Sequence, residues 1–228
     1  MPTALVNEQG RRTTVRKEME EICQNYFNAL FASTKSIPPL SIEQIERVPD
    51  VLGVEIEKAV RQMKRGKAVG PGETRAGKIR EGGEILAEAL SIRFTKYINT
   101  GRIPEQSKHA RTALIPKKGD REDIRNYRPI TLLSDLYKIF MGVMYARMER
   151  TLDENMPREQ EGFRKRFSTT DHIFTIWQLA ERCREYKLPL CFLFVDFEKA
   201  FDSVEHNAVL RAMTDQGVEA AYVRNRKQ

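Results

Sequence analysis

The stretch LCFLFVDFEKAFDSV, residues 190–204, decides the fold class. Its first half is a short apolar run of aromatic and branched residues after Pro189, which is typical of a buried strand rather than a helix. The run ends in Asp196, and an ionised carboxylate beside a buried strand needs a metal or a charged partner because its burial is otherwise costly. The pattern predicts a central strand that delivers Asp196 to a site. For an isolated Val-Asp pair, a simple turn cap is the alternative.

The composition limits the class of protein. The 228 residues suit one domain or a domain with an extension, and no apolar run approaches the roughly 18 residues that span a bilayer. The N-terminus lacks the apolar segment of a secretory signal, so we expect an intracellular protein with no membrane partner. Cys23, Cys183 and Cys191 have no zinc or redox spacing. The 39 Lys and Arg against 32 Asp and Glu give a net charge of +7, which favours an acidic partner such as nucleic acid.

Apolar periodicity predicts the helices. They cover residues 14–32, a short segment from Val54 to Gly66, residues 83–99, a long segment capped by Ser134, and residues 170–186. The third should bury Ile85, Leu86, Ala89, Leu90, Phe94 and Tyr97, and the last two are amphipathic enough to pack on a sheet. A capping box of Asp202 and Glu205 should open a further helix through Leu210.

Two short extended segments predict a hairpin. Residues 110–116 and 126–133 are separated by turn residues that begin KKGD, so that two basic strands and a basic turn result. Residues 36–50 contain three prolines and are expected to connect the first helix to the rest of the chain. Helices come first and strands mixed with helices follow, an order that predicts an α+β fold.

Residues 72–78, GETRAGK, match the first seven places of the phosphate-binding loop of P-loop NTPases. The next residue is Ile79, which lacks the hydroxyl that binds Mg²⁺, and no apolar strand leads into Gly72. A coincidental match in a glycine-rich loop is therefore the better interpretation, and a P-loop NTPase remains a distant alternative.

Several motifs together resemble one family. They are GKAVGPGE (66–73), IPKKGD (115–120), NYRPITLLS (126–134), YKIF (137–140), QEGFRKRFSTTDHI (160–173) and FVDFEKAFDSV (194–204). Their order and spacing resemble those of the reverse transcriptases of non-LTR (LINE-type) retrotransposons over residues 40–224. The resemblance implies a right-hand polymerase fragment. It divides the chain into a helical extension and connector (1–52), fingers (53–188) and the first strand and helix of the palm (189–228).

The resemblance also implies roles for residues. Lys117 or Lys118 and Arg128 would hold the triphosphate of the incoming nucleotide, a role that suits cationic side chains, although a solvated basic hairpin is the alternative. Phe201 would exclude a ribose 2′-hydroxyl. The metal ligands would be the Asp196 carboxylate, which is also the catalytic group, and the backbone carbonyl of Phe197. Phe163, Arg164 and Arg166 would contact the template, whereas His172 is expected to be an ordinary helix residue.

The implied reaction is RNA-templated DNA synthesis with Mg²⁺, in which the primer 3′-hydroxyl attacks a deoxynucleoside triphosphate and releases pyrophosphate. Template RNA and primer or target DNA would be partners, in the nucleus or a cytoplasmic ribonucleoprotein. The sequence departs from the family at Gly70-Pro71-Gly72-Glu73, where an aspartate is missing, and contains no Tyr/Phe-x-Asp-Asp motif. Because two-metal catalysis needs carboxylates from both places, the 228-residue polypeptide alone should be inactive. A non-catalytic nucleic-acid-binding remnant of a decayed element is the competing hypothesis.

Overall fold

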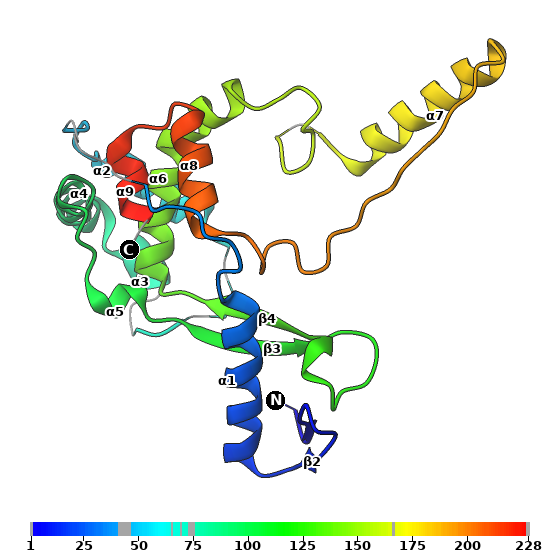
Figure 1. Cartoon of the computed structure of the whole chain (residues 1–228). Coiled ribbons are helices and arrows are strands. Elements are labelled where there is room, and N and C mark those ends of the chain that lie inside the picture. Colours follow the sequence, from blue (N-terminus) through cyan, green and yellow to red (C-terminus); the bar gives the residue numbers. More distant parts are fainter. Residues whose placement is uncertain are drawn as a thin grey trace.

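The computed structural model describes residues 2–40, 47–64, 66–68, 70–72, 76–165 and 167–226. These residues form helices and short antiparallel strand pairs, in agreement with the predicted mixture of helix and strand (Figure 1). In chain order the elements are β1 (Leu5–Val6), β2 (Arg12–Thr13), α1 (Arg16–Phe31), α2 (Gly53–Gln62), α3 (Ala76–Glu81), α4 (Gly83–Thr100), α5 (Glu105–Lys108), β3 (Arg111–Pro116), the 3₁₀ turn η1 (Ile124–Asn126), β4 (Tyr127–Leu132), α6 (Asp135–Glu154), α7 (Thr169–Glu185), α8 (His206–Asp215) and α9 (Ala220–Arg226).

The main hydrophobic core lies between α2, α4, α6, α8 and α9. The hydroxyl oxygen of Ser134 accepts a hydrogen bond from the Tyr137 N–H and so caps α6, as predicted. From α6, the side chains of Ile139, Phe140, Val143, Met144 and Met148 enter the core. Among the described residues, no helix is long and apolar enough to cross a membrane.

Helix α4 has the predicted bounds but a narrower buried face. Ile85 is 86% exposed and Ala89 is also exposed, so their predicted burial is wrong. The buried residues of α4 are Ala87, Leu90, Ser91, Phe94 and Ile98, which follow one stripe at helical spacing. That stripe packs on α2 and α9, and the ring of Phe94 meets Phe140 of α6 edge-on at 5.1 Å. Ile85 and Ala89 lie outside it.

The predicted hairpin is present, with β3 antiparallel to β4 and Ile115 opposite Arg128. Gly70, in the preceding glycine-rich loop, lies against the end of this hairpin. A Cβ atom on Gly70 would stand 2.3 Å from the carbonyl oxygen of Leu132, so this position requires glycine. The departure from the family at Glu73 lies outside the described residues.

The N-terminal segment packs on one side of the hairpin. Leu5, Ile124 and Tyr127 form a second small core with the apolar face of α1, as the predicted packing helix requires. The Val6 N–H donates to the Glu122 carbonyl, and the Arg12 guanidinium holds the Glu122 carboxylate at 2.8–2.9 Å. Residues 2–31 therefore brace the turn that joins β3 to β4.

The predicted palm strand is wrong in this structure. Residues 189–197 form no strand, and Leu193, Phe194 and Val195 are 90%, 80% and 64% exposed. A strand is stable when its backbone pairs with a neighbour, and no strand among the described residues runs beside this segment. The β-prone composition is present, but the described residues supply no strand to pair with it.

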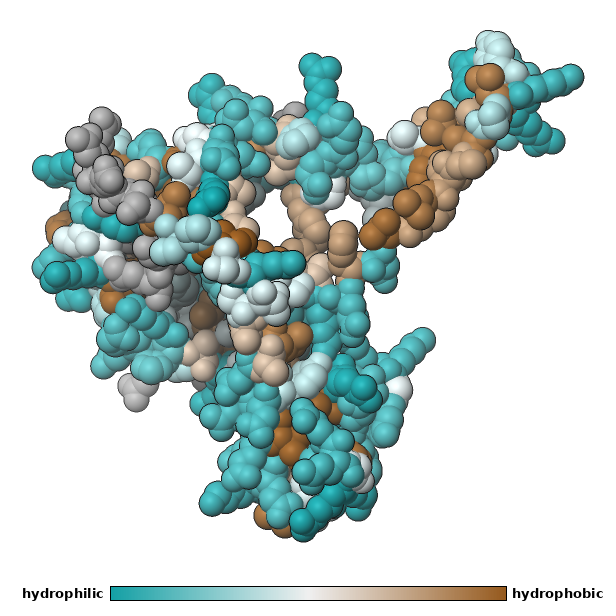
Figure 2. Space-filling view, viewed as in Figure 1, coloured by the Kyte–Doolittle hydropathy of each residue, from teal (hydrophilic) through white to brown (hydrophobic). Residues whose placement is uncertain are grey.

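Helix α7 forms as predicted but does not pack on a sheet. It projects from the body of the molecule, and no residue of α7 is buried (Figure 1). Its apolar side chains, including Ile173 and Trp177, are exposed, and Figure 2 shows apolar residues along its length. None of the described residues therefore covers the apolar face of α7, from which packing was predicted.

The predicted capping box of Asp202 and Glu205 is also wrong. Helix α8 begins at His206, which makes Glu205 the N-cap residue, and the Glu205 side chain makes no capping hydrogen bond. The carboxylate instead accepts hydrogen bonds from the Ser33 hydroxyl at 2.6 Å and from the N–H groups of Thr34 and Lys35. The long-range contact of Glu205 with residues 33–35 therefore takes the place of the predicted local cap.

Candidate functional site

The hairpin places two of the predicted phosphate-binding residues on one face. The Lys117 N–H donates to the Asn126 carbonyl at 2.7 Å, which continues the ladder beyond the pairing of Ile115 with Arg128. Because side chains alternate along a strand, Lys117, Ile115 and Arg128 share the face opposite to the one that Leu114 and Tyr127 pack against α1. Lys117 and Arg128 are exposed there. Neither forms an ion pair with any described residue.

The turn that carries Lys118 is held by its own hydrogen bonds. The Asn126 amide donates to the Asp120 carbonyl at 2.9 Å, and the Tyr127 hydroxyl donates to the Arg121 carbonyl at 2.6 Å. The Arg125 guanidinium donates to Asp123 and holds the pKa of that carboxyl below its usual range. A basic face on a braced turn suits an anionic ligand, since its cations are already positioned.

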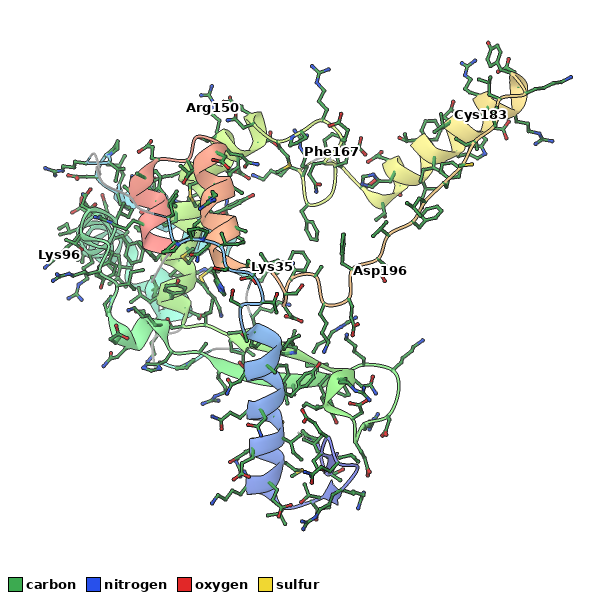
Figure 3. All side chains as sticks on the ribbon, viewed as in Figure 1. Lys35, Lys96, Arg150, Phe167, Cys183 and Asp196 are labelled. Carbon is green, nitrogen blue, oxygen red and sulfur yellow. The ribbon has the colours of Figure 1, made fainter. Side chains whose placement is uncertain are left out.

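Asp196 lies on the exposed segment between α7 and α8 (Figure 3). Its carboxylate forms no hydrogen bond or ion pair with the described residues, and so none with Lys117, Lys118 or Arg128 of the hairpin. The oxygen donors of Asp196 and of the Phe197 backbone suit Mg²⁺. However, no three His, Cys, Asp or Glu side chains gather into a metal site in the described part of the chain. In this arrangement the two residues do not hold an ion by themselves.

The segment that follows Asp196 runs past the N-terminal helix. The Lys199 ammonium contacts both the hydroxyl and the ring of Tyr26 in α1. The pKa of Arg125 is raised first by its hydrogen bonds to Asp123 and, to a smaller extent, by the charge of Glu198. Figure 3 labels Lys35 where the end of α1 meets this segment. Sequence reasoning missed the contacts of Lys199 with Tyr26 and of Glu205 with Ser33 because these partners are more than 170 residues apart and share no local pattern.

Phe163 and Phe201 meet, although they were predicted to serve different parts of the site. Their ring centroids are 5.6 Å apart and their planes lie at 87°, the edge-to-face geometry that aromatic pairs prefer. Phe163 has a φ of 63°, a left-handed conformation that is costly for a bulky residue, and its side chain is 94% exposed. The loop therefore presents this ring outward beside the candidate sugar-contacting residue.

Arg164 is already engaged within the protein. Its guanidinium bonds to Asp153 of α6 at 3.2 Å and lies 5.4 Å above the ring of Phe167. Template contact by Arg164 would therefore compete with these partners. Arg166 lies outside the described residues. His172 bonds to Glu161 at 2.9 Å, which confirms the expectation of a satisfied helix histidine.

Comparisons with known proteins identify the family. Residues 115–227 match the family described as "Reverse transcriptase (RNA-dependent DNA polymerase)". A transposon TX1 uncharacterized 149 kDa protein of Xenopus laevis is 35% identical over 51% of the chain. The RNA-directed DNA polymerase from mobile element jockey of Drosophila melanogaster is 26% identical over 90% of it. The Pol polyprotein from type-1 retrotransposable element R2 of Popillia japonica is 29% identical over 52% of it.

The chain spans 9%, 22% and 16% of the lengths of these three relatives. The matched residues include the hairpin face of Lys117 and Arg128, the loop of Phe163 and the segment of Asp196. All the motifs that predicted the family, except GKAVGPGE (66–73), lie within the matched residues. The chain belongs to the reverse transcriptases of non-LTR retrotransposons, of whose proteins it spans a part.

Proposed function

We propose that the protein to which this chain belongs is an RNA-directed DNA polymerase that copies retrotransposon RNA into DNA. The proposal rests on the match of residues 115–227 to the reverse transcriptase family. Its substrates are template RNA, a DNA primer or target, and deoxynucleoside triphosphates. The protein acts inside the cell, in the nucleus or a cytoplasmic ribonucleoprotein.

The proposed division of the chain follows the resemblance. Residues 1–52 form an extension and connector, residues 53–188 the fingers, and residues 189–228 the start of the palm. Within the fingers, Lys117, Lys118 and Arg128 bind the triphosphate, and their exposure without ion-pair partners supports that role. Phe163, Arg164 and Arg166 contact the template, and Phe201 lies beneath the nucleotide sugar.

Mg²⁺ is the proposed form of the divalent ion that the family implies. The Asp196 carboxylate and the Phe197 carbonyl would hold it, together with ligands that the described residues do not bring to the site. When bound, the ion would neutralise charge on the reacting phosphate. Lys117 and Arg128 would neutralise the remaining phosphate oxygens, which assists release of pyrophosphate.

A non-catalytic nucleic-acid-binding protein is the second candidate. It is favoured by the exposed, unpaired segment of Asp196 and by the lack of a three-ligand cluster among the described residues. Such a protein would keep the basic hairpin face and bind RNA. It would not extend a primer under any condition.

Primer extension on an RNA template separates the two candidates. The protein translated from the whole reading frame that contains this sequence should extend the primer in Mg²⁺, and Asp196→Asn should abolish extension. Asp215→Asn, at the end of α8, is the matched control and should leave extension intact. The 228-residue polypeptide alone should bind RNA without extending. RNA binding without extension by the whole protein would establish the second candidate instead.

A further inference from the structure

A basic hollow lies on α4, outside the candidate polymerase site. Its lining residues are Arg93, Lys96, Tyr97, Thr100 and Arg102, and its volume is about 650 Å³. None of them is acidic. The three cations are exposed and form no ion pair with any described residue, whereas Arg12, Arg147 and Arg164 elsewhere each bind a carboxylate. Figure 3 places Lys96 on the opposite side of the molecule from Asp196.

Helix geometry gathers these residues on one face. Arg93, Lys96, Tyr97 and Thr100 are spaced at i, i+3, i+4 and i+7, so they project from the same side of α4. The helix ends at Gly101 in the left-handed conformation, with φ of 66°, and Arg102 follows this turn. The Thr100 hydroxyl fixes the turn because it donates to the Lys96 carbonyl at 2.7 Å and accepts from the Arg102 N–H.

The wall of the hollow is rigid. The Tyr97 ring packs against Phe94 and Phe140, with centroids 6.1 and 5.9 Å away, and so is fixed by the main core. From α9, the Arg224 guanidinium donates to the carbonyls of Ile98 and Asn99 at 3.1 and 2.7 Å, and it holds the end of α4 in place. The cations of the hollow therefore project from a fixed scaffold.

Protein stability does not explain this arrangement. Arg93 and Lys96 are like charges three residues apart, so they are neighbours on the helix surface and repel each other. The negative end of the helix dipole offsets part of that repulsion. A bound anion would remove the rest.

The shape of the hollow indicates which anion. At a helical rise of about 1.5 Å per residue, Arg93 and Thr100 are separated by roughly 10 Å along the axis, and Arg102 lies beyond the end of the helix. A single phosphate could reach only part of this face, whereas successive phosphates of one nucleic-acid strand could contact all three cations. We propose that the α4 hollow is a second nucleic-acid site, which binds the phosphodiester backbone of RNA. The choice of RNA rests on the proposed function.

The test is RNA binding by the 228-residue polypeptide, measured by fluorescence anisotropy with a labelled single-stranded RNA over a range of salt concentrations. The variant is Arg93→Gln/Lys96→Gln/Arg102→Gln. The matched control is Arg11→Gln/Arg16→Gln/Lys17→Gln, which removes the same charge from exposed residues of the N-terminal segment. Each lost single-strand phosphate contact should lower the logarithmic salt slope by about 0.7. The slope of the hollow variant should therefore fall by about 2, and the slope of the control should not change.

Equal slopes for the two triple variants would overturn the proposal. If the hollow variant fails to fold, judged by circular dichroism, Lys96→Gln alone should still lower the slope by about 0.7. A third variant with Lys117, Lys118 and Arg128 changed to Gln separates this proposal from the proposed function. A lower salt slope for this third variant, together with an unchanged slope for the hollow variant, would contradict the second site and leave the proposed function standing. Ile85 and Ile92 of α4 are also exposed, so an anionic membrane is the other surface that this helix could bind. Binding to phosphatidylserine vesicles is therefore measured for the same variants. If the hollow variant loses vesicle binding and keeps RNA binding, the proposal is overturned.

Discussion

Arg147 of α6 and Glu55 of α2 form a two-pronged ion pair that joins the middle of the helical core. Guanidinium nitrogens lie 2.8 and 2.7 Å from the two carboxylate oxygens, and the Arg147 side chain is 13% exposed. Arg147 also donates to the carbonyls of Pro49 and Asp50. The pair therefore fixes the end of the connector as well as two helices.

Glu55→Gln should destabilise the protein by about 2 kcal/mol, because it leaves a largely buried guanidinium without its counter-charge. Urea unfolding at neutral pH, followed by circular dichroism, measures the change. Glu20→Gln is the control, since it breaks the exposed Arg16–Glu20 pair of α1 and should have little effect. Equal losses of unfolding free energy in the two variants would show that the Arg147–Glu55 pair stabilises the protein no more than an exposed ion pair does.

Acid should remove the contribution of this pair. Hydrogen bonds from Arg147 lower the pKa of Glu55, against the effect of burial, so its folded-state pKa lies below the unfolded value of about 4.3. The stabilisation is complete above the unfolded pKa and is lost as the pH falls through the folded one. The difference in unfolding free energy between the wild type and Glu55→Gln should therefore shrink below about pH 4. A difference that stays constant down to pH 3 would contradict this linkage.

The sequence predicted elements whose causes are local. Ser134 caps α6 by a bond to a residue three positions away, and the β3–β4 hairpin follows from two β-prone segments and a polar turn. Two other predictions were wrong because distant residues determine the structure of those segments. Residues 190–197 have strand composition without a neighbouring strand, and Glu205 binds Ser33 rather than capping its own helix.

The candidate site likewise has features that the sequence predicted and others that it did not. The alternation that places Lys117 and Arg128 on one hairpin face follows from the strand pairing, which the sequence predicted. The contact between Phe163 and Phe201 could not be predicted, because it depends on a left-handed residue in one loop and the path of another. Roles for individual residues came from the family resemblance and stay predictions.

Trp177 reports whether α7 is uncovered in solution. It is the single tryptophan of the chain, and its side chain is 54% exposed on the projecting helix. Its fluorescence emission should resemble that of a solvated indole and be quenched by acrylamide nearly as strongly as in the unfolded protein. Blue-shifted, protected emission at low protein concentration would mean that α7 folds back on the core. A blue shift that grows with concentration would indicate self-association through this apolar face.

Phe201→Val should allow ribonucleotide incorporation by the protein translated from the whole reading frame, because the smaller side chain leaves space for a 2′-hydroxyl. The ratio of ribonucleotide to deoxynucleotide incorporation measures this directly in primer extension. Phe192→Val is the control, since it removes the same ring from the same exposed segment nine residues earlier. If the two variants have the same ratio as the wild type, Phe201 does not contact the sugar.

Arg128→Ala tests whether the basic hairpin face binds phosphate. A guanidinium that makes a two-pronged phosphate contact releases counterions when it binds, whereas a solvated surface arginine contributes almost nothing. In the 228-residue polypeptide, RNA binding should be weak, largely independent of sequence and steeply reduced by salt. Arg128→Ala and Lys118→Ala should each lower the logarithmic salt slope by roughly 0.7 for single-stranded RNA.

Arg11→Ala is the matched control for that experiment, because Arg11 is exposed in the N-terminal segment and has no proposed ligand. Its slope should equal that of the wild type. Anisotropy with one labelled RNA across a salt series compares all three variants. Equal slopes in the three would mean that RNA is held by diffuse charge, and Lys118 and Arg128 would then be solvated residues of a structural hairpin.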